Sequence, residues 1–281
     1  MQLLKQRDFS SFFSDTFRFI KENGAHFFVN YFIINGVFLL ISMAKSYYTG
    51  QGETLPVMFE MLYVLFAIFF GTLNWTFVTI YMILYNERGL DFDYKDVLEY
   101  YKQNIGKIVV FMLVSIILII PIIIVFYIAL ILVAITIVGP FLLYAALIIW
   151  FALAFYEYLY TNKGVFDCFG YAWTLFTKKF WATTGSTALL YVIIFIIYGL
   201  ALTLTGVFSS LFEMNASDPE GSVLAIQRAF STPLNLVVLT FLSVLMVLIQ
   251  ISQGIIYFSQ KEQLENISTN HGIDEIGKIE F

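Results

Sequence analysis

The sequence predicts an all-α, polytopic integral membrane protein: six transmembrane helices, arranged as three repeats of an amphipathic interfacial helix followed by a helical hairpin. Three observations predict this fold. Hydrophobic residues make up 60% of the chain and charged residues only 12%. In soluble domains about half of the residues are apolar and about a quarter are charged. The apolar residues lie in long runs that are almost free of charge. A similar amphipathic segment precedes each pair of runs.

Six runs are long enough to cross a bilayer, which takes about 20 apolar residues. Between Lys107 and Lys163 the only acidic or basic side chain is Glu157, which suits a pair of spans. The predicted spans are Phe27–Ala44, Pro56–Tyr85, Ile108–Val133, Pro140–Tyr160, Trp181–Phe212 and Pro233–Gln260. A turn over Ile137–Pro140 divides the third span from the fourth, and Pro121 should kink the third.

The amphipathic segments lie at Phe9–Gly24, Phe92–Ile105 and Val165–Phe180, and they align with one another at offsets of 81 and 75 residues. The aligned sets are Phe13, Tyr94 and Phe169; Phe17, Leu98 and Trp173; Ile20, Tyr101 and Phe176; and Gly24, Ile105 and Phe180. The repeats run over about 8–85, 91–160 and 164–260 within a single membrane domain, 1–260. A polar cytoplasmic tail is expected over 261–281.

The distribution of Lys and Arg predicts the orientation. Of the 15 such residues, only Lys45 and Arg228 lie in connections on one side of the predicted membrane. The remaining 13 lie at the N-terminus, in the second-to-third and fourth-to-fifth connections and in the tail. Both termini, and all three amphipathic segments, are therefore expected on the cytoplasmic side.

Helices with an aromatic face and a charged face lie in the plane of the interface. The residues expected on this interfacial face are Phe13, Phe17, Leu98, Tyr101, Trp173 and Phe176. Two interpretations stay open at this point. The segments are either elbows that lead the chain into the next span, or a cytoplasmic collar that binds lipid headgroups or a partner.

Polar side chains inside the apolar runs are the candidates for function, because burying them in a bilayer is costly. They are Asn74, Glu157, Gln250 and Gln253. We expect Glu157 to pair with Lys178, Lys179 or Arg88 near the inner boundary. The amides are expected to form hydrogen bonds between helices, or, in a transporter, to converge with Glu157 on a cavity.

Motifs for catalysis are absent from the sequence. His26 and His271 have no neighbouring acid, Cys or second His at ligand spacing, and the single Cys168 excludes an internal disulfide. No phosphate-binding or dinucleotide glycine pattern and no nucleophile elbow occurs. We therefore expect no enzyme, no catalytic residue, no metal, no cofactor and no nucleic-acid partner.

Two features are similar to a known group of proteins. The segments Phe9–Asn23 and Val165–Phe176 each lead into a hairpin of spans, and Tyr257–Glu262 is followed by Ile273–Gly277. In these features the chain resembles the bacterial six-span families related to the membrane domain of glycerophosphodiester phosphodiesterases, including Bacteroidota-type members. In those proteins the phosphodiesterase activity resides in a separate soluble domain, so the resemblance implies a location and an architecture, not a reaction.

Two functions remain in competition. The first is a non-catalytic protein of the bacterial inner membrane that acts through lipid or protein contacts, with membrane lipids, or other subunits of a membrane complex, as its partners. The second is a transporter, channel or lipid translocase with a cavity on a pseudo-threefold axis.

Overall fold

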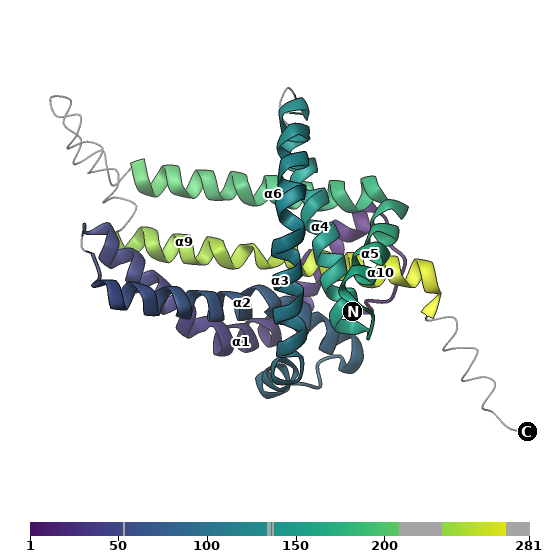
Figure 1. Ribbon diagram of the computed structural model, residues 1–281, viewed down its shortest axis with the longest axis horizontal. Helices are drawn as coiled ribbons and strands as arrows, with labels where there is room; N and C mark the ends of the chain where they lie inside the picture. The colour runs from purple at the N-terminus through teal and green to yellow at the C-terminus, as the bar shows by residue number, and fades with distance from the viewer. Residues whose placement is uncertain (53, 134–135, 137, 208–231, 268–281) are drawn as a thin grey trace, which may run out of the picture. The chain divides into compact units, whose positions relative to one another are not determined.

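The computed structural model describes residues 1–52, 54–133, 136, 138–207 and 232–267, and these residues are helical over most of their length. The helices are α1 Phe9–Gly50, α2 Val57–Arg88, α3 Tyr94–Val133, α4 Gly139–Tyr160, α5 Val165–Lys178, α6 Phe180–Leu202, the π-helical turn η1 Thr203–Val207, α9 Pro233–Leu245 and α10 Val247–Glu265. No strand occurs within these ranges. Figure 1 shows the helices with these labels.

Six helical stretches are long and apolar enough to cross a membrane. The prediction of six long apolar helices is thereby confirmed, and each stretch overlaps one of the predicted runs. An uncharged run forms a helix in an apolar medium because a helix satisfies its own backbone hydrogen bonds. The sixth stretch consists of α9 and α10, which are separated only at Met246. Pro140 lies in the first turn of α4, where its missing N–H costs nothing.

The amphipathic segments differ from the expectation of three separate helices. The first two are continuous with the apolar runs that follow them, in α1 and α3, and only the third forms a helix of its own, α5. The backbone leaves the helical conformation at Lys179, with φ −132° and ψ 48°. No proline interrupts the first two junctions, and an isolated glycine such as Gly24 is tolerated within a helix, so nothing there ends the helix.

The described residues pack as two compact units. We call Met1–Phe27, Val78–Tyr191 and Leu248–Phe281 the charged unit, and Phe28–Phe77 and Val192–Val247 the second unit. Twelve of the thirteen described Lys and Arg residues belong to the charged unit, and so do twelve of the thirteen described Asp and Glu residues. The two exceptions, Lys45 and Glu60, pair with each other at 2.8 Å. The single membrane domain expected over 1–260 stays a prediction.

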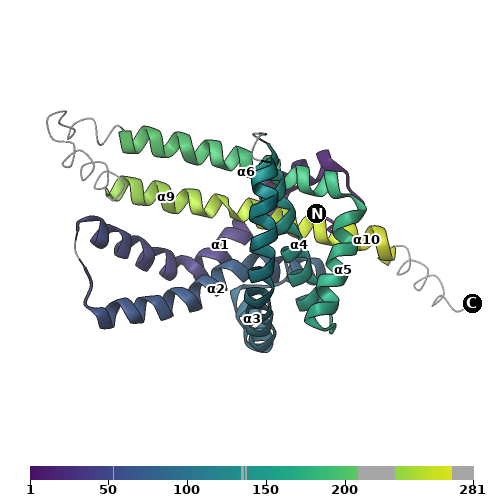
Figure 2. The same cartoon turned by 45° about the horizontal axis from the view of Figure 1, so that its top comes forward.

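Aromatic packing joins α3, α4 and α5 in the charged unit. Phe169 of α5 is stacked on Phe111 of α3, with ring centroids 5.4 Å apart and planes 9° from parallel. Trp150 of α4 donates its indole N–H to the Phe169 carbonyl at 3.1 Å. Figures 1 and 2 both show α3 and α4 side by side, with α5 next to α4. These contacts fix the position of the third amphipathic segment against the second hairpin.

The first two helices meet the start of the second repeat at His26. Its Nε2 lies 2.7 Å from the Phe92 carbonyl, and its Nδ1 lies 2.7 Å from the Tyr81 hydroxyl. A carbonyl only accepts, so Nε2 carries a proton and, in the neutral ring, Nδ1 accepts from Tyr81. His26 therefore connects α1, α2 and the turn before α3.

The last helix, α10, extends further than the sequence indicated. It ends at Glu265, and Lys261 and Glu262 are only 4% and 5% exposed. The beginning of the expected polar tail is thus part of a packed helix, whereas residues 268–281 lie outside the described residues. Close packing is visible at Gly254, where an added Cβ would lie 2.6 Å from the Tyr156 hydroxyl oxygen.

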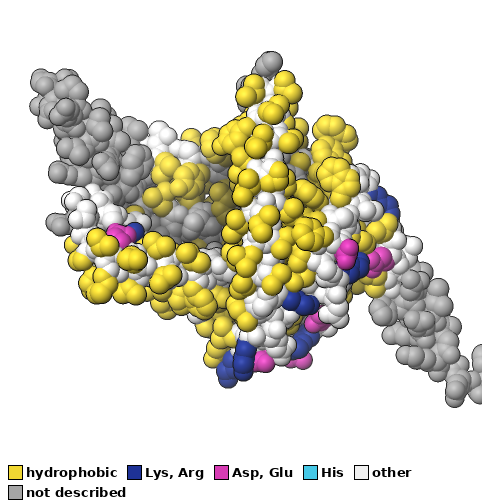
Figure 3. All heavy atoms as spheres, in the orientation of Figure 1, with side chains coloured by type: hydrophobic (Ala, Val, Ile, Leu, Met, Phe, Trp, Pro, Cys, Tyr) yellow, Lys and Arg dark blue, Asp and Glu magenta, His cyan; other side chains and the backbone are white. Residues whose placement is uncertain are grey.

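The visible surface of α3 is largely apolar. Figure 3 shows hydrophobic side chains along this helix, with charged side chains gathered near its start. Ile117 and Ile131, for example, are 68% and 73% exposed. Such a surface is unfavourable in water and favourable among lipid chains, in agreement with a spanning role for α3.

Candidate functional site

The four polar residues predicted inside the apolar runs fall in both units. Asn74 belongs to the second unit, where its amide donates to the Tyr31 hydroxyl at 2.9 Å, a hydrogen bond from α2 to α1 of the kind predicted. Glu157, Gln250 and Gln253 belong to the charged unit. Glu157 and Gln253 are buried and Gln250 is half-buried. Convergence of all four on one cavity stays a prediction.

Glu157 lies near the end of α4 and is completely buried. Its Oε2 accepts hydrogen bonds from the Tyr257 hydroxyl at 2.7 Å and from the Lys261 ammonium at 2.9 Å. Its Oε1 accepts one from the Lys163 ammonium at 2.7 Å. Tyr257 and Lys261 are one turn apart on α10, so both reach the same carboxylate. Glu157 therefore connects α4, the turn after α4 and α10.

The positive charges around Glu157 are balanced by a second carboxylate. Lys261 also lies 3.2 Å from Glu265, which accepts a hydrogen bond from the Tyr171 hydroxyl. Burial, and then the bond to Glu265, raise the pKa of Tyr171, so this hydroxyl keeps its proton and donates. The Lys163 ammonium lies 3.8 Å from the centre of the Tyr171 ring, a favourable cation–π distance. We call Glu157, Lys163, Tyr171, Tyr257, Lys261 and Glu265 the Glu157 network.

The partners predicted for Glu157 are wrong, although pairing with lysine is confirmed. Lys178 donates to the Gln263 carbonyl, Lys179 to the Arg7 carbonyl, and Arg88 pairs with Asp96. The observed partner Lys163 follows Glu157 by six residues and folds back after α4 ends at Tyr160. The other partner, Lys261, was assigned to the tail. Lys261 is buried, and α10 continues past the apolar run to Glu265.

The chemistry open to the Glu157 network is limited. Both carboxylate oxygens accept hydrogen bonds from within the protein and the side chain is completely buried, so these internal bonds account for its position. Among the described residues, no three His, Cys, Asp or Glu side chains gather in a way that could hold a metal ion. The network connects α4, α5 and α10, which is typical of a structural role.

Arg7 is a second buried charge, and nothing in the sequence marked it as a candidate site residue. It is 2% exposed and donates through Nε to Asp15 at 2.8 Å. Its remaining nitrogens donate to the carbonyls of Gln2, Leu3 and Lys5. Burial lowers the pKa of Arg7, and the adjacent Asp15 opposes that shift. No spacing rule in the sequence marks an arginine that binds its own preceding backbone.

The interfacial face divides by register in the structure. Phe17, Leu98 and Trp173, which occupy one aligned position of the three repeats, are 42%, 44% and 54% exposed. Tyr101 and Phe176, one turn further along, are each 4% exposed, and Phe13 is half-buried. We call Phe17, Leu98 and Trp173 the exposed triplet; all three belong to the charged unit.

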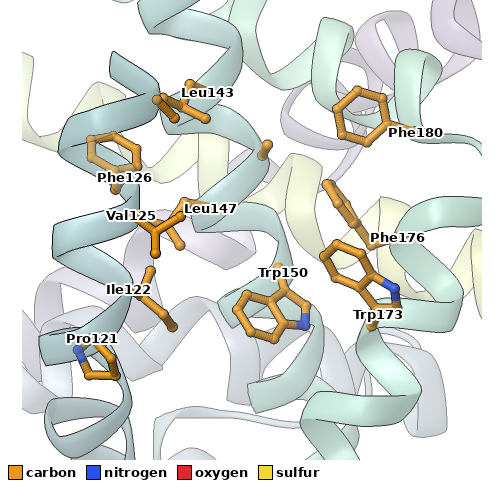
Figure 4. Close-up of a pocket in the computed structure, with 12 residues that line it drawn as sticks. Pro121, Ile122, Val125, Phe126, Leu143, Leu147, Trp150, Trp173, Phe176 and Phe180 are labelled. Atoms are coloured by element: carbon orange, nitrogen blue, oxygen red, sulfur yellow. The ribbon is translucent and has the colours of Figure 1, made fainter. Parts of the chain in front are cut away.

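An apolar cleft of about 530 Å³ lies beside Trp173. Its walls are Pro121, Ile122, Val125, Phe126 and Ala129 of α3, Leu143, Ala146, Leu147 and Trp150 of α4, Trp173 and Phe176 of α5, and Phe180 of α6. Figure 4 shows the α3 side chains on one side, the α5 and α6 aromatic rings on the other, and Trp150 between them. No ionisable side chain lines this cleft.

Cys168 of α5 should react slowly with alkylating reagents. It is fully buried, and burial raises the pKa of its thiol from 9.0 to about 11. The thiolate is the nucleophile, so at pH 8 the folded protein should react with iodoacetamide about a hundredfold more slowly than the unfolded chain. The rate should rise about tenfold for each pH unit up to pH 11.

Mass spectrometry of the alkylated protein, with and without denaturing detergent, measures this difference. Equal rates in the two states would show that Cys168 is accessible and that its burial is wrong.

Comparison of the chain with models of known protein families, with characterised proteins and with solved structures yields no match.

Proposed function

We propose that this chain is a non-catalytic inner-membrane protein that contacts phospholipids through the cytoplasmic end of its charged unit. The exposed triplet is the observation that carries this proposal. Three apolar side chains at one aligned position of the repeats remain 42–54% exposed in the unit that holds nearly all the described charges. Large apolar side chains beside charged ones are typical of helices that lie at the membrane interface.

Orientation and repeat organisation belong to the same proposal. The bias of Lys and Arg supports an inner-membrane orientation with both termini cytoplasmic. Similar exposure at the one aligned position of the exposed triplet supports three related repeats, even though only α5 is a separate helix. The Glu157 network supports a structural role for the buried charges, because each oxygen of the Glu157 carboxylate accepts a hydrogen bond from within the protein.

Replacing the exposed triplet with serine (Phe17→Ser, Leu98→Ser, Trp173→Ser) should weaken phospholipid binding. Removing each partly exposed side chain should cost on the order of 1 kcal/mol of interaction with lipid, so the triple variant should bind at least about tenfold more weakly. The measurement is titration of the detergent-solubilised, full-length protein with short-chain phosphatidylglycerol.

The next residue in each repeat provides a matched control. Arg18, Glu99 and Thr174 are also exposed, and replacing them with serine leaves the net charge unchanged. This control should bind phosphatidylglycerol as the parent does. If the triplet variant binds lipid normally but loses a co-purifying protein, the surface is a protein interface and the lipid proposal is wrong.

A further inference from the structure

The apolar cleft between α3, α4 and α5 has the chemistry of a hydrocarbon site. All twelve residues that line it are apolar or aromatic. The indole N–H of Trp150 already donates to the Phe169 carbonyl. A polar ligand would lose its hydration here without gaining hydrogen bonds in return. A hydrocarbon chain has no hydrogen bonds to water to lose, so the lining favours hydrocarbon over a polar ligand.

We infer that this cleft holds one acyl chain of a diacyl phospholipid, an inference that rests on the lipid contact proposed above and names its site. The volume of about 530 Å³ lies within the range of about 300–1,000 Å³ that small-molecule sites occupy. The cleft also shares one residue, Trp173, with the exposed triplet. A lipid that contacts Trp173 at the interface can therefore insert a chain between α3 and α5.

Two lysines lie in the chain between residues that line the cleft. Phe176 and Phe180 line the cleft, and Lys178 and Lys179 lie between them in the chain. Lys178 is exposed and donates once, to the Gln263 carbonyl, and Lys179 donates to the Arg7 carbonyl. An ammonium has three donor hydrogens, so both lysines retain donors for a phosphate. This complementarity favours an anionic phospholipid over an uncharged hydrocarbon.

A lipid held in the cleft differs from lipid that surrounds any membrane protein in how slowly it exchanges. Two of the four tryptophans, Trp150 and Trp173, line the cleft and report on its contents. Trp75 lies in the second unit, 43% exposed, and reports on surrounding lipid. Bromine atoms on an acyl chain quench indole fluorescence at short range, so each reporter measures the lipid beside it.

The test uses two full-length reporter proteins. The cleft reporter carries Trp75→Phe and Trp181→Phe; the reference reporter carries Trp150→Phe, Trp173→Phe and Trp181→Phe. Each is reconstituted into vesicles of phosphatidylcholine and phosphatidylglycerol, in which the phosphatidylglycerol carries brominated chains. Excess lipid of the same composition without bromine is then added in detergent, and the exchange of lipid is followed. Fluorescence of the cleft reporter should recover at least about tenfold more slowly than that of the reference.

Filling the cleft should abolish the slow recovery. Ala146→Phe adds a ring from α4 and Ala129→Phe adds one from α3, so one variant remains if the other fails to fold. Ile128→Phe is the matched control, because Ile128 is exposed on α3 and does not line the cleft. The slow phase should persist in this control and disappear in the two cleft variants.

Three outcomes overturn the inference. The first is equal recovery of fluorescence in both reporters, and the second is a slow phase that survives both cleft-filling substitutions. The third is absence of quenching, together with a cross-link showing that the chain's own tail or a second copy occupies the cleft. Binding of short-chain phosphatidylglycerol that still depends on Phe17 and Leu98 would leave the proposed function intact in each case, since neither residue lines the cleft. Loss of that dependence as well would overturn both.

Discussion

Replacing Glu157 with glutamine should destabilise the protein by on the order of 3 kcal/mol. The substitution removes the charge that balances Lys261, whose side chain is only 6% exposed, and leaves Glu265 as its remaining acidic partner. Breaking a buried ion pair from one side is expensive because the other charge stays buried. Equilibrium unfolding of the full-length protein in mixed micelles, followed by tryptophan fluorescence, measures the change.

The chain offers a matched pair of controls for this experiment. Glu60→Gln breaks the Lys45–Glu60 pair, whose side chains are 23% and 37% exposed, and should cost no more than about 1 kcal/mol. The double variant Glu157→Met with Lys261→Met removes both buried charges and should recover most of the lost stability. Equal losses for Glu157→Gln and Glu60→Gln would show that the Glu157 network does not stabilise the fold.

Replacing Gly254 with alanine should also destabilise the protein, by about 1–3 kcal/mol, because the helices leave no room for a methyl group. The new Cβ would lie 2.6 Å from the Tyr156 hydroxyl oxygen and 3.0 Å from the Cγ and Cε atoms of Met82. At Gly254, α10 therefore packs closely against side chains of α2 and α4. The same unfolding measurement applies.

Two further variants give this prediction its controls. Adding Tyr156→Phe to Gly254→Ala removes the nearest atom and should restore part of the lost stability. Gly170→Ala, in α5, meets nothing within 4 Å and should be neutral or stabilising by about 0.5–1 kcal/mol, since alanine favours helix. A Gly254→Ala protein as stable as the parent would mean that the three helices are less closely packed.

Local features of the sequence were sufficient to predict the helices. A run such as Ile108–Val133 has no charged residue, and a helix satisfies its own backbone hydrogen bonds in a bilayer. The periodicity of the amphipathic segments predicted one apolar face for each of them, because residues three or four apart share one side of a helix. It did not predict which part of that face is covered. Leu98 and Tyr101 share a face, yet Leu98 is 44% exposed and Tyr101 only 4%.

The Glu157 network was harder to predict because its partners are distant in the chain. Lys261 follows Glu157 by 104 residues, and charge counting assigned it to a solvated tail. Hydropathy averages along the chain, so it places the end of a helix at its first charged residue. The helix α10 instead continues past Lys261, and this lysine pairs with the buried Glu157. Such a pairing is a property of the tertiary fold. For the same reason the bonds of Arg7 to its own preceding backbone had no signature.

The separation between Glu157 and Lys261 also sets an order of events during synthesis. At about 5–20 residues per second, the ribosome completes Lys261 roughly 5–20 s after Glu157. Until then the carboxylate has only Lys163 as a cationic partner within the network, and two of its three hydrogen-bond donors do not yet exist. The charged unit is therefore completed by α10, the last of the described helices. A chain that ends before Tyr257 has a Glu157 carboxylate whose Oε2 lacks both of its donors, near the end of α4.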